Sequence, residues 1–304
     1  MHHVTVFDSS KLQVDPVYAR CSEGYTRASH IGPAHGGALH TGMGTCELAP
    51  GGRLDRHVHS FEELVYVLAG TPIIELDGEA RQLAPGSCAF IGVGATHAWA
   101  NPGGESARWL DLQTPPARPP ELPADTFFVS GAAPETAAPL DVRDPRSRRF
   151  FQWHAQQMEL EAVRETAPVD APEISASMSS ALLAYSGIAI KMLIDHRHGA
   201  HLGNLFMVEY QPEVVLHPHD HPIEEAFYIV EGEIVYIADG QEYVMGPGGV
   251  AYAGVGCIHA FENRSGKRVR WIESRAPLPP LHHEYRFDRD WAYLATRLAP
   301  AAER

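Results

Sequence analysis

Two histidines and a glutamate in one short stretch of the chain could bind a metal ion. His57, His59 and Glu63 share parity along the sequence, and side chains on a β-strand alternate between its two faces. One strand can therefore aim all three at the same side, and His97 can face them from a neighbouring antiparallel strand. Three neutral imidazoles and one carboxylate suit Mn, Fe, Ni, Co, Cu or Zn. Four protein ligands leave one or two positions open on an octahedral ion, as a catalytic metal requires.

The same four residue types recur at one fixed offset, since 219 − 57 = 162. The second set consists of His219, His221, Glu225 and His259. The offset also aligns a Pro-Gly turn, a Gly-Val-Gly segment and an Arg-Trp pair: Pro85-Gly86 with Pro247-Gly248, Gly92-Val93-Gly94 with Gly254-Val255-Gly256, and Arg108-Trp109 with Arg270-Trp271. An internal repeat of this kind predicts two structural units. We expect one divalent transition metal in each.

Three residues next to the predicted ligands in the sequence need separate consideration. Glu62 and Glu224 have the opposite parity to the ligands and should point away from the metal. His217 shares parity with His219 and His221, so it is a candidate catalytic acid, base or substrate contact in the second cavity. A histidine at the surface end of a strand explains it as well. Paired histidines can also be ordinary core residues, but eight ligand-type residues repeated at one offset favour metal sites.

Each unit is predicted to be built of β-strands. Segments such as 64–68 and 226–230 are short, rich in β-branched and aromatic residues, and bounded by glycine. Asp77-Gly78 and Asp239-Gly240 each separate two such runs, which is a strong signal for a hairpin turn. Turn signals recur every eight to twelve residues, and this spacing indicates a sandwich or barrel. We therefore expect an all-β fold.

The repeat and the composition between its copies predict the domain organisation. We expect an N-terminal barrel over residues 1–115 and a C-terminal barrel with a tail over residues 166–304. Residues 116–165 are rich in proline and alanine at their start and are predicted to form an extended connector that packs over the surface through Phe127 and Phe128. Residues 150–162 could form a short helix or be irregular.

Taken together, the two motifs resemble the signature of the cupin superfamily, in which a G-x5-HxH-x3-E-x6-G segment is followed by a G-x5-P-x-G-x2-H-x3-N segment. The resemblance covers both halves and all eight ligands, so the chain looks like a two-domain cupin, or bicupin. It implies a double-stranded β-helix, or jelly-roll, barrel in each half with a metal inside. Three positions depart from the pattern: the motif proline is Gly92 and Gly254, and Glu213 replaces the leading glycine that is Gly51 in the first copy.

Composition excludes several classes of protein. The formal net charge is 24 − 38 = −14, which disfavours nucleic-acid binding. The sequence has no apolar run of about 18 residues, so we expect no membrane span. The first residues have neither a basic nor an apolar region of a secretion signal. Four scattered cysteines fit reduced thiols rather than a disulfide framework, and we expect a cytoplasmic protein.

The ligand sets favour a metal-dependent oxidoreductase, a dioxygenase acting on a small organic substrate with Mn or Fe. Ni, Zn, Co and Cu remain alternatives. A non-redox hydrolase, isomerase or decarboxylase, similar to ureidoglycine aminohydrolase or oxalate decarboxylase, is the first rival interpretation. A metal-binding or small-molecule-binding protein without turnover is the second. A homodimer is possible, although no motif supports it and two barrels in one chain can already cover each other's edge strands, the usual reason that cupins pair.

Overall fold

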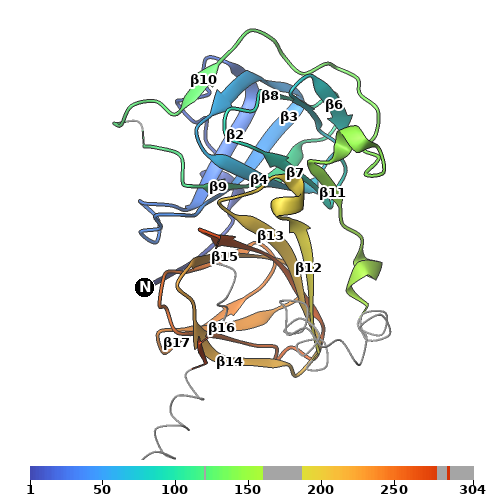
Figure 1. Cartoon of the computed structure of the whole chain (residues 1–304). Coiled ribbons are helices and arrows are strands. Elements are labelled where there is room, and N and C mark those ends of the chain that lie inside the picture. Colours follow the sequence, from blue (N-terminus) through green and yellow to red (C-terminus); the bar gives the residue numbers. More distant parts are fainter. Residues whose placement is uncertain (120, 160–186, 279–285, 288–304) are drawn as a thin grey trace, which may run out of the picture.

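A computed structural model of the chain describes residues 1–119, 121–159, 187–278 and 286–287. It consists of two curled β units, one above the other (Figure 1). This confirms the predicted all-β fold of tandem jelly-roll barrels. None of the helices in the described ranges combines the length and the apolar character needed to cross a bilayer.

The first unit is formed mainly by one ten-stranded sheet that curls upon itself, in the order β11-β7-β4-β9-β3-β8-β5-β6, with β2 and β10 also paired to β3. Its strands are β2 (Ser22–Ile31), β3 (Gly42–His59), β4 (Glu62–Ala69), β5 (Ile73–Leu76), β6 (Glu79–Gln82), β7 (Ser87–Ile91), β8 (His97–Ala100), β9 (Ala107–Thr114), β10 (Thr126–Phe128) and β11 (Phe150–Gln152). Short 3-10 turns lie at η1 (Ser9–Lys11), η2 (Pro145–Ser147) and η3 (Ala155–Met158).

The second unit consists of two sheets, with strand orders β1-β18-β15-β20-β13-β12 and β17-β16-β19-β14-β21. Its strands are β1 (His2–Val6), β12 (Ile188–Ile194), β13 (Asn204–Tyr210), β14 (Val215–Asp220), β15 (Glu224–Glu231), β16 (Ile234–Ala238), β17 (Gln241–Met245), β18 (Gly249–Ala253), β19 (His259–Glu262), β20 (Val269–Ala276) and β21 (Arg286–Phe287). A 3-10 turn, η4 (His196–His198), follows β12.

The backbone at the motif glycine differs between the units. In the first unit Gly51 has φ = 71° inside the long strand β3. Glu213 occupies the equivalent place with φ = 63°, between the shorter strands β13 and β14. A left-handed conformation is strained for any residue with a Cβ atom, so the departure from the motif has a conformational cost in the second unit.

Both predicted hairpin turns are present. Asp77 and Gly78 have φ = 49° and 87° between β5 and β6, and Asp239 and Gly240 have φ = 48° and 77° between β16 and β17. Positive φ at both central residues is the conformation that a tight two-residue hairpin needs, and Asp-Gly supplies it with little strain.

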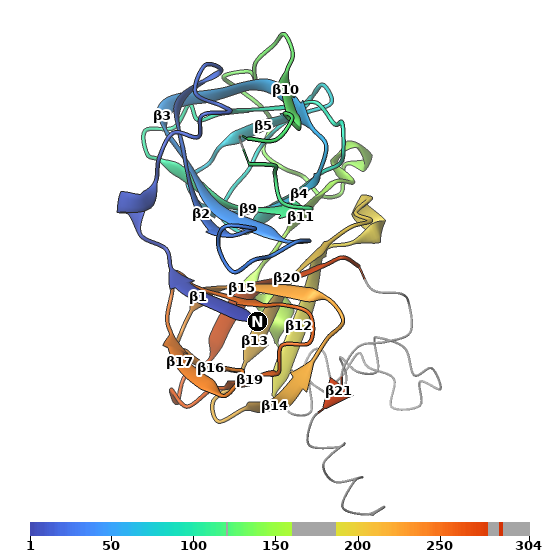
Figure 2. The ribbon, with the colours of Figure 1, turned by 90° about the vertical axis from the view of Figure 1, so that its left-hand side faces the viewer.

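The N-terminal strand crosses from one unit to the other. β1 pairs antiparallel with β18, from His2 opposite Ala253 to Val6 opposite Gly249, and Figure 2 shows it beside the strands of the second unit. The corresponding edge of the first unit, β7, is covered by β11, with Phe150 opposite Ala89. Residues 2–6, which the sequence analysis placed in the N-terminal barrel, therefore belong structurally to the second sheet. The other domain boundaries remain predictions.

Strand alternation divides the core into three parts. On β4, Val65 and Val67 pack inside the first barrel, whereas Leu64 and Tyr66 join a cluster that holds residues of both units. On β15 the same alternation places Phe227 inside the second barrel and Tyr228 in the shared cluster. The face of these strands that points away from each barrel is thus buried against the other barrel.

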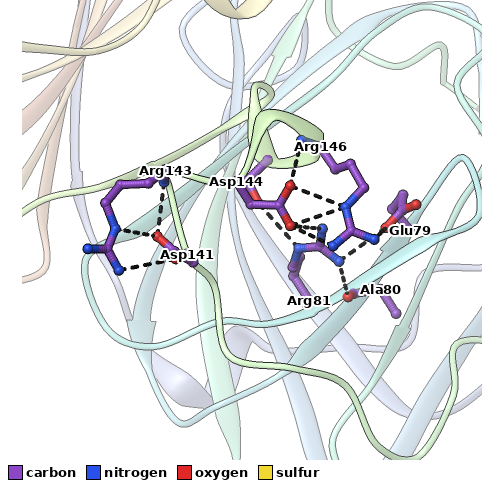
Figure 3. Close-up of polar contacts among 8 residues, drawn as sticks. Glu79, Ala80, Arg81, Asp141, Arg143, Asp144 and Arg146 are labelled. Atoms are coloured by element: carbon purple, nitrogen blue, oxygen red, sulfur yellow. Dashed lines mark hydrogen bonds and ion pairs between the residues drawn. The ribbon is translucent and has the colours of Figure 1, made fainter.

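The described part of the predicted connector is docked on the first unit. The backbone N–H of Leu140 donates to the carbonyl of Gln82 at 2.9 Å, and the guanidinium of Arg81 on β6 lies 3.3 Å from Asp144, as Figure 3 shows. Phe150 to Gln152 form strand β11, and only Ala155–Met158 are helical, as a single 3-10 turn. Residues 160–162 of the proposed short helix lie outside the described ranges.

Candidate metal centres

The first predicted ligand set converges inside the first barrel. The end of β3 supplies His57 and His59, the start of β4 supplies Glu63, and β8 brings in His97 directly opposite His57. The imidazole centroids of His57 and His97 are 3.9 Å apart, and those of His59 and His97 are 4.8 Å apart. The Nε2 atoms of His59 and His97 lie 3.1 and 3.9 Å from Oε2 of Glu63.

Each imidazole of this set is oriented through its other ring nitrogen. The Nδ1 atoms of His57, His59 and His97 lie 2.9, 2.7 and 3.1 Å from the backbone carbonyl oxygens of Asp55, Phe61 and Ala95. A carbonyl can only accept, so each Nδ1 carries the proton and each Nε2 presents a lone pair, as in metal-binding histidines. The Nε2 of His97 is buried and has no hydrogen-bond partner among the described residues. The donor set therefore fits a divalent transition metal.

Burial keeps the imidazoles of His57 and His97 neutral, which is the state that binds metal. It lowers the pKa of His57 to about 4. The pKa of His97 is held well below its ordinary value by burial and by the neighbouring His57 and His59.

The second predicted ligand set also converges, but with a different trio: His219, His221 and His259 offer ligand atoms within 4.8 Å of one another, as His59, Glu63 and His97 do in the first set. His219 lies on β14 and His221 directly follows that strand, Glu225 lies on β15, and His259 lies on β19 opposite His219. The imidazole centroid of His219 is 5.0 Å from that of His221 and 4.4 Å from that of His259. The Nδ1–H groups of His219 and His259 donate to the carbonyls of His217 and Cys257 at 2.7 and 3.0 Å.

The carboxylate of the second set has an arginine partner, which the first carboxylate lacks among the described residues. The Nε of Arg275 lies 2.7 Å from Oε1 of Glu225, and the same guanidinium is 3.3 Å from Glu273. Glu225 and Arg275 are paired across β15 and β20, and Glu63 has Gln113 at the equivalent position across β4 and β9. Gln113 donates its amide to Asp111 at 3.0 Å.

These charges shift the pKa values of the second set. Although burial favours the neutral acid, His221 and Arg275 hold the pKa of Glu225 well below its ordinary value. Burial opposes protonation of His259, yet its hydrogen bond to Glu225 raises the pKa of this imidazole. Burial and the charge of Glu225 raise the pKa of Glu273 to about 7.

The space beside the second set is small. His219, Glu225, His259 and Arg275 line a cavity of about 20 Å³, which is room for about one water molecule. Glu225 is 1% exposed and Glu63 is 8% exposed, so the first carboxylate is the more accessible of the two.

Glu62 and Glu224 point away from the metal ligands, but they do not face solvent. Both are buried. Glu62 accepts the backbone N–H groups of His201 and Leu202 at 2.9 Å, and Glu224 accepts those of residues 39, 40 and 41 at 2.8–2.9 Å. Each carboxylate therefore anchors a loop of the opposite barrel, because the outer face of its strand is the interface between the barrels.

His217 is exposed and does not line the cavity beside the second set. The pairing of β14 with β19 shifts register between Leu216 and His219. Such a β-bulge interrupts strand alternation, so the parity that suggested a cavity position does not hold here. The catalytic role suggested for His217 remains only a prediction.

Arg275 was missed by the sequence analysis, although a signal for it was available. The 162-residue offset aligns it with Gln113 in strands that otherwise match closely. A charged residue at an inward position of a buried strand needs a partner, and Glu225 is that partner.

Sequence comparison finds a family match in both halves and relatives that each match part of the chain. The family model described as "Cupin domain" matches residues 44–113 and 206–274. The tetracenomycin polyketide synthase protein TcmJ of Streptomyces glaucescens is 29% identical over 119 residues, which are 39% of this chain and 80% of the relative. The protein SchB of Streptomyces halstedii is 34% identical over 104 residues, which are 34% of this chain and 75% of the relative.

Structural comparison shows the same two-barrel fold in enzymes of low sequence identity. Salicylate 1,2-dioxygenase from Pseudoaminobacter salicylatoxidans has a TM-score of 0.62 and 13% identity, over 81% of this chain and 72% of that one. Oxalate decarboxylase from Bacillus subtilis has a TM-score of 0.63 and 13% identity, over 97% of this chain and 82% of that one.

Proposed function

The chain belongs to the cupin family, and on this premise we propose that it is a metal-dependent oxidoreductase of the dioxygenase type whose turnover takes place in the first barrel. One observation carries the proposal. The first set has three imidazoles fixed by backbone carbonyls around a carboxylate that faces Gln113 rather than a guanidinium. A metal held there would keep open positions for reactants.

The metal that fits this donor set best is Fe(II) or Mn(II), with Ni, Zn, Co and Cu as alternatives. When bound, it supplies the redox and Lewis-acid chemistry of the reaction. His57, His59, Glu63 and His97 would hold it in the first barrel, and the equivalent residues of the second set would hold a second ion.

Aromatic side chains enclose the first set and would shape its substrate pocket. Phe61 stacks on His59 with centroids 4.0 Å apart, and the rings of Tyr18 and Phe128 lie 5.5 and 5.4 Å from His57. Burial, together with the charge of Glu63, raises the pKa of Tyr18, so its phenol stays protonated. These residues exclude water and favour a flat, partly apolar substrate over a highly charged one.

The comparisons support a small oxygenated aromatic substrate. One structural neighbour is a salicylate 1,2-dioxygenase, whose substrate is aromatic, and the TcmJ relative is named as a tetracenomycin polyketide synthase protein. This substrate class is a proposal for the present chain.

The test is oxygen uptake by the full chain after anaerobic loading with Fe(II) or Mn(II). Candidate substrates are salicylate, gentisate, polycyclic phenols and oxalate, and products are identified by mass spectrometry. We expect oxygen consumption with an aromatic substrate, abolished in His97→Ala and retained in His259→Ala. A metal-loaded protein that consumes no oxygen with any of these compounds would refute the proposal.

Arg275 favours a second candidate, a non-redox decarboxylase acting in the second barrel. If Glu225 coordinated a metal instead of pairing with Arg275, the guanidinium of Arg275 could bind a substrate carboxylate. The same assay distinguishes this reaction, because oxalate would then release carbon dioxide without net oxygen uptake and the activity would be lost in His259→Ala.

A further inference from the structure

Three potential metal ligands meet outside both cupin sites. His2 is on β1, Asp239 is in the turn between β16 and β17, and Cys257 precedes β19. One ligand atom from each lies within 4.8 Å of the others. Bonds of about 2.0–2.3 Å to a tetrahedral ion place its ligand atoms about 3.5 Å apart, so side-chain rotations would close the group around a cation.

The hydrogen bonds of His2 leave a place for a cation. Tyr243 donates its hydroxyl proton to Gln241 at 2.6 Å, so its oxygen accepts from Nε2–H of His2 at 2.8 Å. The other ring nitrogen, Nδ1, then lies 3.1 Å from Oδ2 of Asp239. A bare Nδ1 and a carboxylate oxygen are both acceptors, and only a proton or a metal ion between them makes the contact favourable. The amino group of Met1 also lies 3.3 Å from this oxygen.

The equivalent place in the first unit has an ordinary ion pair. There Asp77 takes the position of Asp239 and forms an ion pair of 2.7 Å with Arg149, which directly precedes edge strand β11. The residue equivalent to Cys257 is Ala95. The second unit thus has an imidazole in place of a guanidinium and a thiol in place of a methyl group. Both changes add metal ligands.

We propose that His2, Asp239 and Cys257 form a third metal site, which binds a divalent thiophilic cation such as Zn2+. Nitrogen, oxygen and sulfur donors suit this class of ion. Binding breaks the S–H bond of Cys257, forms a metal–sulfur bond and releases the proton to solvent. Tyr243 would orient the imidazole through its other nitrogen.

Such an ion would join separate parts of the second unit. It would tie β1 to the β16–β17 hairpin and to Cys257, whose backbone carbonyl orients His259. The site therefore has a structural role for the N-terminal strand and lies next to the second ligand set.

Anaerobic titration of the metal-free full chain with Co2+ tests the proposal, using a C-terminal tag without histidine. Neither cupin ligand set contains cysteine, so a thiolate-to-cobalt charge-transfer band reports the third site alone. We expect one equivalent of this band, displaced by Zn2+. It should vanish in Cys257→Ala and persist in the matched control Cys88→Ala, another buried cysteine. Tyr243→Phe should weaken Co2+ binding about 10-fold.

Two results would overturn the site: a wild-type protein without the band, or a band that survives in Cys257→Ala. If Cys257→Ala does not fold, Asp239→Asn and His2→Gln decide the question, because Asp239 is exposed and His2 is on an edge strand. A band of unchanged affinity in both variants would equally overturn the proposal.

Discussion

The two ligand sets have the same residues at the same offset, but their carboxylates are in different electrostatic surroundings. Glu63 faces Gln113, whereas Glu225 is paired with Arg275 at 2.7 Å. The first and last imidazoles of each set are held alike, by carbonyls two residues away. The motif therefore determines which atoms can bind a metal. The residue opposite the carboxylate, Gln113 or Arg275, determines whether a positive charge competes with the metal for that carboxylate.

Each barrel places one arginine beside an acidic residue of its last long strand, but from a different direction. In the first barrel Arg27 on β2 pairs with Asp111 at 2.8 Å. In the second, Ile190 takes the place of Arg27, since each lies opposite the equivalent residue of the adjacent strand, Val208 and Cys46. There Arg275 contacts both Glu273 and Glu225. A buried carboxylate needs such a partner. In the second barrel the arginine is on β20, the same strand as Glu273, and from there it also reaches the metal ligand Glu225.

The largest effects should come from removing one imidazole in each set. His57→Ala should empty the first site and His219→Ala the second. We expect more than about 100-fold weaker metal binding in the altered site, because even outer partners of metal ligands contribute about 10- to 100-fold. Element analysis of the purified variants measures this. Equal metal loss from both barrels in either variant would show that the sites are not independent.

Exchanging the residues opposite the carboxylates tests the comparison directly. Arg275→Gln should tighten metal binding in the second site about 10-fold or more, and Gln113→Arg should weaken it in the first, because a buried positive charge repels the cation. Competition with a chelating dye measures both affinities. Unchanged affinity in both variants would show that Arg275 turns away from Glu225 at no cost when metal binds.

The interface anchors should affect stability rather than metal content. Glu62→Ala and Glu224→Ala each leave buried N–H groups without acceptors, and we expect a loss of about 1–3 kcal/mol. The loss should be larger for Glu224, which accepts three N–H groups. Urea unfolding and element analysis measure the two properties. A large loss of metal would mean that the ligand positions were assigned one residue away from the true ones.

The smallest effect concerns the backbone at the motif glycine. Glu213→Gly should stabilise the second barrel by about 1 kcal/mol and Gly51→Ala should destabilise the first by a similar amount, because both positions have positive φ. Thermal unfolding compares them. Two shifts of the same sign would contradict this explanation.

Local patterns predicted the features that depend on local geometry. The Asp-Gly turns and the convergence of the ligand residues follow from turn chemistry and strand alternation. His217 does not lie on the predicted cavity-facing side of β14. The pairing of β14 with β19 shifts register between Leu216 and His219, and side chains alternate regularly only where the register is unbroken. Parity showed that Glu62 points away from the metal, but not that a loop of the other barrel lies there.

These local patterns could not predict which strands pair over long distances in the sequence. Nothing in residues 2–6 indicates which sheet they join, since an edge strand is specified by the partner that it meets. The pair formed by Arg275 and Glu225 likewise depends on the register between β15 and β20.

The reciprocal anchoring by Glu62 and Glu224 makes the joint between the barrels resemble the interface of a symmetric dimer, but within one polypeptide. In a true homodimer every substitution appears twice, so an arginine beside one metal site would have to be tolerated beside the other. A single chain removes that constraint. One site can carry an arginine while its twin carries a glutamine, and the shared interface holds both barrels in place whichever residue each site has.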